Sequence, residues 1–146
     1  MSTKPSPKDL ALRWFEEIWN HRTPDTIDAL LHIDGVGNTE GGVVRGRQQV
    51  REALYEPLVR AFPDMKVVVD ACIAEGNDAA VRWTVTGTQT GELMGIPPSN
   101  RKVTFSGMSW LVVRDGMLVS GWDRWNMSGL LEFLRSGSDC ATVRPL

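Results

Sequence analysis

The stretch from residue 65 to residue 125 constrains the fold most, because four segments of it have the composition and spacing typical of antiparallel β-strands. The predicted strands cover residues 65–75, 79–89, 101–114 and 117–125. Gly76-Asn77 supplies the turn of the first pair, and Asp115-Gly116, the strongest short hairpin signal, joins the second. The Gly- and Pro-containing segment 90–100 forms a loop between the two hairpins, and Gly87 is a candidate β-bulge.

Three helices are predicted before these strands. The first begins at residues 6–9, where a serine cap precedes a proline and an acid. The second starts at Thr23 and continues until Gly35, with Leu30 and Leu31 inside it. The third begins after Gly46, and Pro57 should kink or split it.

A short last helix over residues 130–134 is predicted to end at Gly137. Helices followed by antiparallel strands indicate an α+β fold, in which a strongly bent sheet wraps around the helices as a cone with an open end. A chain of 146 residues is most simply one domain over residues 1–146, with flexible tails at 1–6 and 138–146.

Composition and charge narrow the range of partners. Hydrophobic residues make up 42% of the chain and charged residues 23%, and a net charge of −2 gives no electrostatic reason to expect nucleic acid or an anionic membrane. No stretch reaches the ~18 apolar residues of a membrane span, and the polar N-terminus lacks the apolar core of a secretory signal. We therefore expect a cytoplasmic protein whose two cysteines, Cys72 and Cys140, stay reduced.

The Asp115-Gly116 turn predicts which residues of the last hairpin share a face. With a two-residue loop, Ser109 lies opposite Trp122 and Gly107 opposite Arg124, and directly opposed side chains meet on one face. This face combines hydrogen-bonding groups with apolar walls, as a ligand pocket does. It carries Val103, Phe105, Gly107, Ser109, Leu111, Leu118, Ser120, Trp122, Arg124 and Asn126. A β-bulge at Gly107 would swap the two faces.

The opposite face of the hairpin is also mixed and includes Met108, Trp110, Asp123 and Trp125. Neither face is plainly solvated. We therefore expect helices to cover one face and a second subunit to cover the other, as in a homodimer.

A series of segments stands in an order that matches one known family. They are residues 15–20 (FEEIWN), 61–64 (AFPD), 81–92 (VRWTVTGTQTGE), 95–98 (GIPP), 114–116 (RDG), and Trp122 with 129–131 (GLL). These segments resemble the SnoaL-like polyketide cyclases (ester cyclases) of the NTF2-like superfamily. The resemblance covers most of the chain. It implies a curved antiparallel sheet packed on three helices, an internal pocket and usually a dimer.

The resemblance also implies a function, namely that of a cofactor-independent cyclase or isomerase acting on a hydrophobic, carbonyl-bearing, polyketide-like small molecule. Cyclases of this family resemble one another in an aspartate four residues after the tryptophan and a histidine on the preceding strand. These positions hold Asn126 and Ser109 here, and the histidine of their Gly-Thr-His-Thr-Gly segment is Gln89. An asparagine cannot exchange a proton at neutral pH, so an aspartate-driven aldol reaction is not expected at Asn126.

Asn126, Ser109 and Arg124 are candidates to donate hydrogen bonds to a carbonyl or enolate oxygen. The alternatives are that Asn126 caps the final helix and that Arg124 pairs with a surface acid. His32, Asp34 and Glu40 lie at the expected pocket mouth. Of these three, His32 is the candidate proton acceptor, because histidine titrates near neutral pH. The expected substrate-binding residues are Trp83, Phe105, Trp122, Asn38, Leu111 and Ser120.

Two other functions remain open. The absent aspartate and histidine suit a non-catalytic ligand-binding or dimeric accessory domain. Asp123, Arg124 and Asp70 resemble the Asp–Arg–Asp set of the epoxide hydrolases of this superfamily, but neighbours along a strand face opposite ways, and Asp123 is then expected on the dimer face or the surface. His21, His32 and the cysteines lack the spacing of a zinc site, so we expect neither a metal nor a cofactor.

Overall fold

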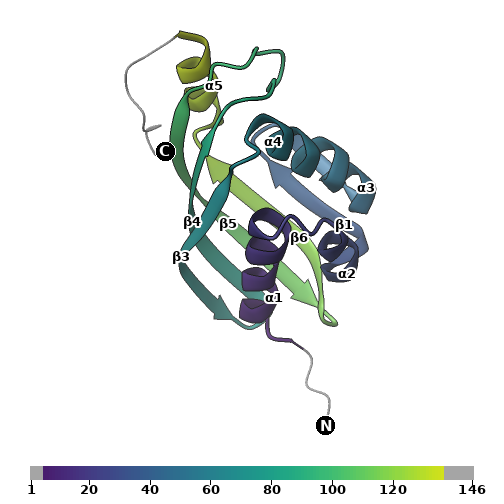
Figure 1. Cartoon of the computed structure of the whole chain (residues 1–146). Coiled ribbons are helices and arrows are strands. Elements are labelled where there is room, and N and C mark those ends of the chain that lie inside the picture. The colour runs from purple at the N-terminus through teal and green to yellow at the C-terminus, as the bar shows by residue number, and fades with distance from the viewer. Residues whose placement is uncertain (1–4, 137–146) are drawn as a thin grey trace.

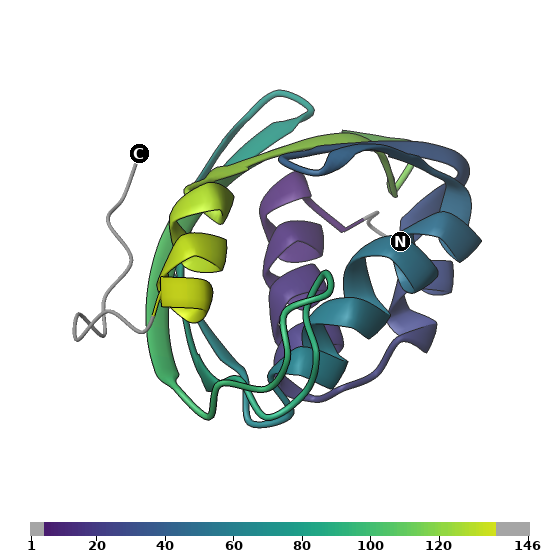
Figure 2. The ribbon, with the colours of Figure 1, turned by 90° about the horizontal axis from the view of Figure 1, so that it is seen from above.

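A six-stranded curved sheet organises the protein, and helices α1 to α4 lie inside its curve (Figures 1 and 2). The computed structural model describes residues 5–136, in which the strand order is β2-β1-β6-β5-β4-β3. The α+β prediction is confirmed. The predicted tails, apart from residues 5 and 6, lie outside the described residues, as do Gly137 and Cys140.

Four strands confirm the two predicted hairpins. They are β3 (Lys66–Glu75), β4 (Asp78–Thr88), β5 (Lys102–Arg114) and β6 (Met117–Trp125). Gly76, Asp115 and Gly116 have φ angles of 60°, 52° and 77°, the left-handed conformation of tight hairpin turns. Gly87 is not a bulge, because it pairs with Val103 in an unbroken ladder. A Cβ atom at Gly87 would instead lie 3.2 Å from that of Phe62.

Two further strands were not predicted from the sequence. They are β1 (Leu31–Thr39) and β2 (Gly42–Arg45), which form a hairpin where we predicted the end of a helix and a loop. The helix stops at Leu30 because the following glycines disfavour helix, while the β-branched Ile33 and Val36 favour strand. β1 pairs in parallel with β6, so the prediction of a wholly antiparallel sheet is wrong in this one pair.

The helices follow the predicted order: three precede the long strands and one follows β6. The segments are α1 (Pro7–Arg13) continuing as the π-helical η1 (Trp14–Asn20), α2 (Asp25–Leu30), then α3 (Gly46–Gln49), π-helical η2 (Val50–Tyr55) and α4 (Glu56–Ala61) in one run, and α5 (Met127–Ser136). The Ser6 hydroxyl accepts a hydrogen bond from the Asp9 amide at 3.1 Å, so the predicted cap is confirmed. Pro57 lies in the first turn of α4, and the change from π to α hydrogen bonding there accommodates its missing N–H.

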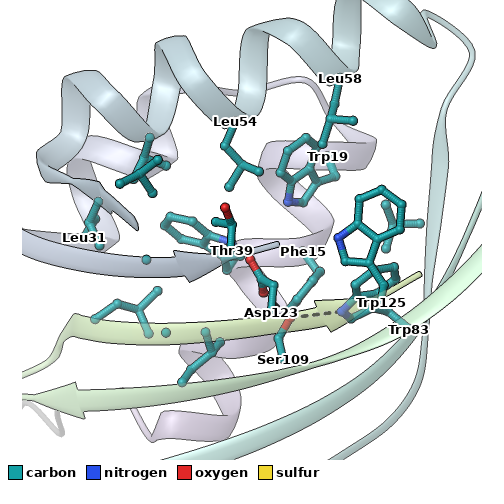
Figure 3. A pocket seen from close by; sticks show the side chains of 18 of the residues that line it. Phe15, Trp19, Leu31, Thr39, Leu54, Leu58, Trp83, Ser109, Asp123 and Trp125 are labelled. Atoms are coloured by element: carbon teal, nitrogen blue, oxygen red, sulfur yellow. Dashed lines mark hydrogen bonds between the residues drawn. The ribbon is translucent and has the colours of Figure 1, made fainter. Parts of the chain in front are cut away.

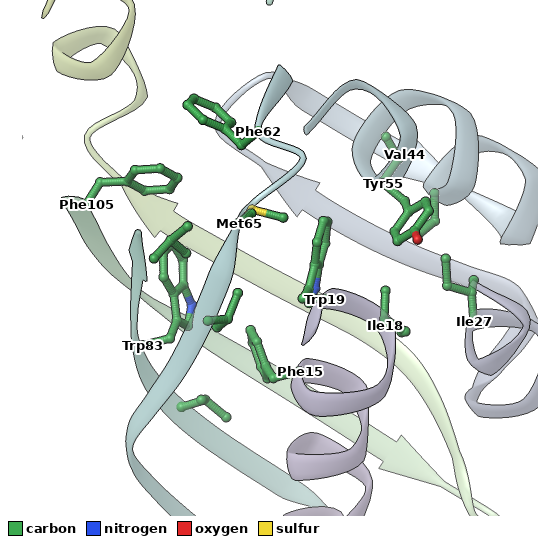
Figure 4. Packing of buried hydrophobic residues seen from close by; sticks show 14 of the residues in the cluster. Phe15, Ile18, Trp19, Ile27, Val44, Tyr55, Phe62, Met65, Trp83 and Phe105 are labelled. Atoms are coloured by element: carbon green, nitrogen blue, oxygen red, sulfur yellow. The ribbon is translucent and has the colours of Figure 1, made fainter. Parts of the chain in front are cut away.

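The first helix supplies the centre of the core (Figure 4). Phe15, Ile18 and Trp19 point from it toward the strands and toward the third helix. The rings of Trp19 and Tyr55 meet with centroids 5.6 Å apart, which joins the first helix to the third. The helices therefore hold the sheet in its curved shape by packing against its concave side.

One buried side chain organises the loop between β4 and β5. Gln89 is 0% exposed, and its Nε2 donates to the carbonyls of Gly91, Ile96 and Pro97 at 3.1–3.2 Å. Its Oε1 accepts from the Ser99 amide at 3.1 Å. The position to which the resemblance assigns a histidine is therefore occupied here by a residue whose hydrogen bonds stabilise the loop.

The substitution Gln89→Met tests this role, because it keeps the length of the side chain and removes its hydrogen bonds. The carbonyls left behind would be buried without a donor, so we expect a loss of about 1–3 kcal/mol in the free energy of unfolding, measured with urea. The exposed Gln48→Met is the matched control and should change stability by less than about 0.5 kcal/mol. Equal stability of the two variants would contradict the role assigned to Gln89.

Candidate functional site

A pocket with a volume of about 110 Å³ lies between the concave side of the sheet and the helices (Figure 3). Its wall is mostly aromatic and aliphatic, with a small polar group at one side. The lining residues are Trp14, Phe15, Trp19, Leu31, Val36, Gly37, Thr39, Val44, Val50, Leu54, Leu58, Met65, Val67, Trp83, Val85, Phe105, Ser109, Leu111, Leu118, Ser120, Gly121, Asp123 and Trp125.

Three polar groups of this wall form one hydrogen-bonded chain. The indole N–H of Trp83 donates to the Ser109 hydroxyl at 2.9 Å, and that hydroxyl donates to Oδ1 of Asp123 at 2.5 Å. Trp83, Ser109 and Asp123 stand on β4, β5 and β6, and they meet because these strands are neighbours in the sheet. Figure 3 shows the Asp123 carboxyl reaching into the space between the sheet and Phe15. These hydrogen bonds fix Oδ1 of Asp123 and leave Oδ2 without a hydrogen-bond partner among the described residues.

A β-bulge in β6 brings Asp123 to this wall. Val113 pairs with Leu118 and Val112 pairs with Ser120, so Val119 is an extra residue in β6. Beyond the bulge Ser109 lies opposite Asp123 instead of Trp122, and every later side chain of β6 changes face.

The predicted register of β6 is therefore wrong beyond this point. It would have turned Arg124 into an apolar cavity, and a guanidinium cannot escape the cost of desolvation by losing its proton. An aspartate can become neutral by taking up a proton, so the observed register places in the pocket the side chain that is less costly to bury.

Gly107 is neither a β-bulge nor an opening for the Arg124 side chain, the two roles that the sequence suggested; it leaves room for two tryptophan side chains. It pairs with Trp125, and a Cβ atom there would lie 2.6 Å from the Arg124 carbonyl oxygen and 2.7 Å from atoms of Trp83 and Trp125. The two indole rings need this space. The Trp125 ring in turn stacks on Phe105 with centroids 4.7 Å apart and planes 24° apart.

Five of the residues predicted to form the site line the pocket. They are Ser109, Trp83, Phe105, Leu111 and Ser120. The prediction for β5 held because its pattern of inward and outward residues runs without interruption. Whether these residues bind or transform a substrate stays a prediction.

The other predicted site residues lie elsewhere. Trp122 and Arg124 are exposed, and the Arg124 guanidinium donates to the carbonyls of Asn38 and Asp123 at 3.3 and 2.8 Å. The Asn38 side chain donates to the Gly121 carbonyl at 3.1 Å. His32 lies on β1 outside the pocket lining, and its Nδ1 accepts from the backbone amide of Asp34 at 3.0 Å. These four residues are therefore not among those that line the pocket.

Asn126 caps helix α5, as the alternative interpretation held. Its Oδ1 accepts from the Gly129 amide at 3.0 Å, and its carbonyl accepts from the Leu130 amide at 3.2 Å. The position to which the resemblance assigns an aspartate is thus a helix cap in this structure. The Asp–Arg–Asp set is not assembled either, since Asp70 bonds to Thr84 at 2.6 Å on the other face of the sheet.

The acid that the sequence reasoning missed is Asp123. Burial raises the pKa of its carboxyl above the ordinary value, and Glu40 adds to this, while the Ser109 hydrogen bond and Arg124 act in the opposite direction. A carboxyl with a raised pKa in an apolar pocket is a common feature of acid–base sites. No residue pattern around Val119 marks the bulge, so the sequence carried no signal for this placement.

The described residues contain no group of three or more His, Cys, Asp and Glu side chains arranged to hold a metal ion. Nor does any helix among them have the length and apolar character needed to cross a membrane.

The raised pKa of Asp123 makes a prediction about stability. A group whose pKa is higher in the folded state stabilises the fold fully below its unfolded pKa, about 3.9 for aspartate, and this contribution is lost as the pH rises through the folded pKa. The stability of the wild type should therefore fall relative to Asp123→Asn as the pH rises from about 4. Urea unfolding at a series of pH values measures the difference.

Ser109→Ala is the companion variant, because it removes the hydrogen bond that lowers the Asp123 pKa. In this variant the loss of stability should extend to higher pH. A stability difference between wild type and Asp123→Asn that does not change with pH would contradict the assignment.

Solved structures similar to this chain share its architecture. A proposed SnoaL-like polyketide cyclase from Jannaschia sp. CCS1 aligns with a TM-score of 0.79 and 23% identity, covering 90% of this chain and 96% of the other. AclR, a proposed hydroxylase from Streptomyces galilaeus, aligns with a TM-score of 0.78 and 33% identity, covering 92% and 83%. IdmH, a proposed polyketide cyclase from Streptomyces antibioticus, aligns with a TM-score of 0.76 and 26% identity, covering 89% and 99%.

No curated protein sequence matches the chain significantly. The family model for SnoaL-like polyketide cyclases matches residues 9–134, a span that includes every described helix and strand except the first two and the last two helical residues. With its curved sheet and apolar pocket, this chain belongs to the SnoaL-like polyketide cyclase family of the NTF2-like fold.

Proposed function

We propose that the protein catalyses proton transfer beside a carbonyl group of a hydrophobic, polyketide-like molecule, as a cyclase or isomerase, with Asp123 as the acid–base group. The observation that carries the proposal is the Trp83–Ser109–Asp123 chain in the wall of an apolar pocket. The family name and that of IdmH support ring closure as the reaction and polyketides as the substrate class.

In the proposed reaction, the Asp123 carboxylate takes a proton from the carbon next to a substrate carbonyl. The electron pair of the broken C–H bond moves into the carbonyl and forms an enolate. In a cyclase the enolate carbon attacks a second carbonyl of the same molecule, and the new alkoxide takes the proton back from Asp123. In an isomerase the proton returns to a different carbon. No group is consumed in either cycle.

Ser109 acts in this scheme as a positioning residue. Its donated hydrogen bond holds Oδ1 of Asp123, so that Oδ2 meets the substrate. The indole N–H of Trp83 keeps the Ser109 hydroxyl pointing at the carboxylate, because the hydroxyl oxygen is occupied as an acceptor.

Exchange of the α-protons of a naphthyl β-ketoester in D₂O, followed by NMR, tests the proposed reaction without knowledge of the natural substrate. Wild-type protein should accelerate the exchange, and Asp123→Asn should lower the catalysed rate by about 10²–10⁴-fold, the range for loss of a general base. Ligand binding should persist in the variant, because asparagine has nearly the same shape as aspartate.

Asn126→Asp is the matched control. It places a carboxylate where related cyclases have one, but this position caps α5 and lies outside the pocket lining, so the exchange rate should not change. Exchange by Asp123→Asn at the wild-type rate would refute the role of Asp123. Binding without exchange in the wild type would favour the non-catalytic alternative, and exchange gained only in Asn126→Asp would do the same.

We propose a second copy of the chain as the partner of the convex face of the sheet. The strand register places Ile73, Ala80, Trp110 and Trp122 in one row across four strands, with Met108 in the adjacent row. The side chains of Ile73, Met108, Trp110 and Trp122 are 72%, 57%, 50% and 39% exposed. Helices α1 to α4 lie on the other side of the sheet (Figure 2), so this apolar area has no cover from them.

The charges on this face support self-pairing. It carries the cations Arg82 and Arg124 together with the acids Asp70 and Asp78, and the Trp110 indole donates to Asp78 at 2.9 Å. A face that carries both cations and carboxylates can pair them with the opposite charges of an identical face across a two-fold axis, as isologous dimers do.

Met108→Glu tests the dimer, because it places a carboxylate on this face in each copy. We expect wild-type protein to sediment as a dimer at micromolar concentration and Met108→Glu to sediment as a monomer. Ala29→Glu, at an exposed position of α2, is the control that should stay dimeric. A monomeric wild type would refute this proposal.

A further inference from the structure

A second, smaller cavity of about 70 Å³ adjoins the pocket, and we call it the outer cavity. Four residues line both spaces and so form their common boundary: Thr39, Leu54, Leu58 and Trp125. The remaining walls are Glu40, Gly41, Ala53, Pro57, Leu93, Met94, Met127 and Leu131. They come from the β1–β2 turn, the third helix, the Gln89 loop and the start of α5.

One charged side chain stands in this apolar surround. Among the described lining residues of the outer cavity, Glu40 is the one that carries a charge. Its Oε1 accepts from the Trp125 amide at 3.3 Å, which fixes the carboxylate beside the β6 strand. The salt bridges within the described residues do not involve Glu40. Its carboxylate therefore has no ion-pair partner among the described residues.

The Trp125 ring connects the two spaces. It lines both, and it stacks on Phe105 at the pocket side, so its orientation is fixed. A ligand that extends from the pocket into the outer cavity would run along this ring and end beside the Glu40 carboxylate. An indole and a carboxylate together are a favourable environment for an ammonium group.

We propose that the outer cavity is a second subsite, which binds a protonated amine on an arm of a ligand whose carbonyl-bearing ring system fills the pocket. This inference rests on the proposed function for the identity of the ring system. It adds that the substrates are elongated molecules with a cationic group at one end, and that Glu40 causes the preference for the cation.

Three ligands separate the contributions of the two spaces. The first is 2-acetonaphthone, which carries only the ring system and the carbonyl. The second adds a 3-ammoniopropoxy arm at carbon 6, and the third adds a butoxy arm of the same length without the charge. Calorimetric titration of the wild type should give an affinity for the ammonium ligand roughly three- to tenfold above that for the butoxy ligand, because Glu40 is exposed and its charge is partly screened.

Glu40→Gln keeps an acceptor for the Trp125 amide and removes the charge. In this variant the ammonium and butoxy ligands should bind equally, while 2-acetonaphthone should bind as it does to the wild type. Glu75→Gln, at the exposed end of β3, is the matched control and should leave the preference for the ammonium ligand intact.

Ala53→Trp tests the space itself, because this exposed position lines the outer cavity and not the pocket. The larger side chain should weaken both arm-bearing ligands and leave 2-acetonaphthone unaffected. Equal affinities of the ammonium and butoxy ligands in the wild type, or a preference that survives Glu40→Gln, would overturn the inference while leaving the proposed function intact. Failure of 2-acetonaphthone to bind would remove the proposed function and this inference with it.

Discussion

One extra residue in β6 decides what the interior of this protein can do. Without the β-bulge at Val119, β6 would direct Arg124 into the apolar pocket and Asp123 toward solvent. With it, the aspartate reaches the serine of the neighbouring strand, and the tryptophan two residues later stacks on Phe105. The polar chain, the aromatic wall and the boundary between the two cavities all depend on this single change of register.

The acid of this pocket, Asp123, stands at a different sequence position from the aspartate that cyclases of this family share. The position four residues after Trp122 holds an asparagine, and it begins helix α5 by satisfying the amides of its first turn. The carboxylate lies three residues earlier, on the strand instead of at the helix cap. This strand position pairs with Ser109 in the ladder between β5 and β6, and the pairing gives Asp123 a rigid support of the kind a catalytic group needs.

Much of the fold was predictable, and the limits of prediction have physical causes. The long hairpins were identified because their turns contain residues that accept positive φ, such as Gly76 and Asp115-Gly116. The pocket-lining residues of β5 were predicted because buried and exposed side chains alternate along this part of the strand. The hairpin β1–β2 was missed because its glycines read as a loop, and its place in the sheet depends on a parallel partner far along the chain. The position of Asp123 was not predicted, because a β-bulge moves side chains to the other face of the sheet without a local sequence signature. Asp123 was therefore expected on the dimer face or the surface.

The parallel pairing of β1 with β6 has a consequence for how the protein is made. Val36, Gly37 and Asn38 find their partners at Ser120, Gly121 and Trp122, more than 80 positions later. A ribosome must release most of the polypeptide before this pair can close, and closing such a long loop is a slow event. The pocket and its carboxyl group can therefore form only after β6 has been synthesised, when this strand pairs with β5, which directly precedes it, and with β1, which was made much earlier in translation.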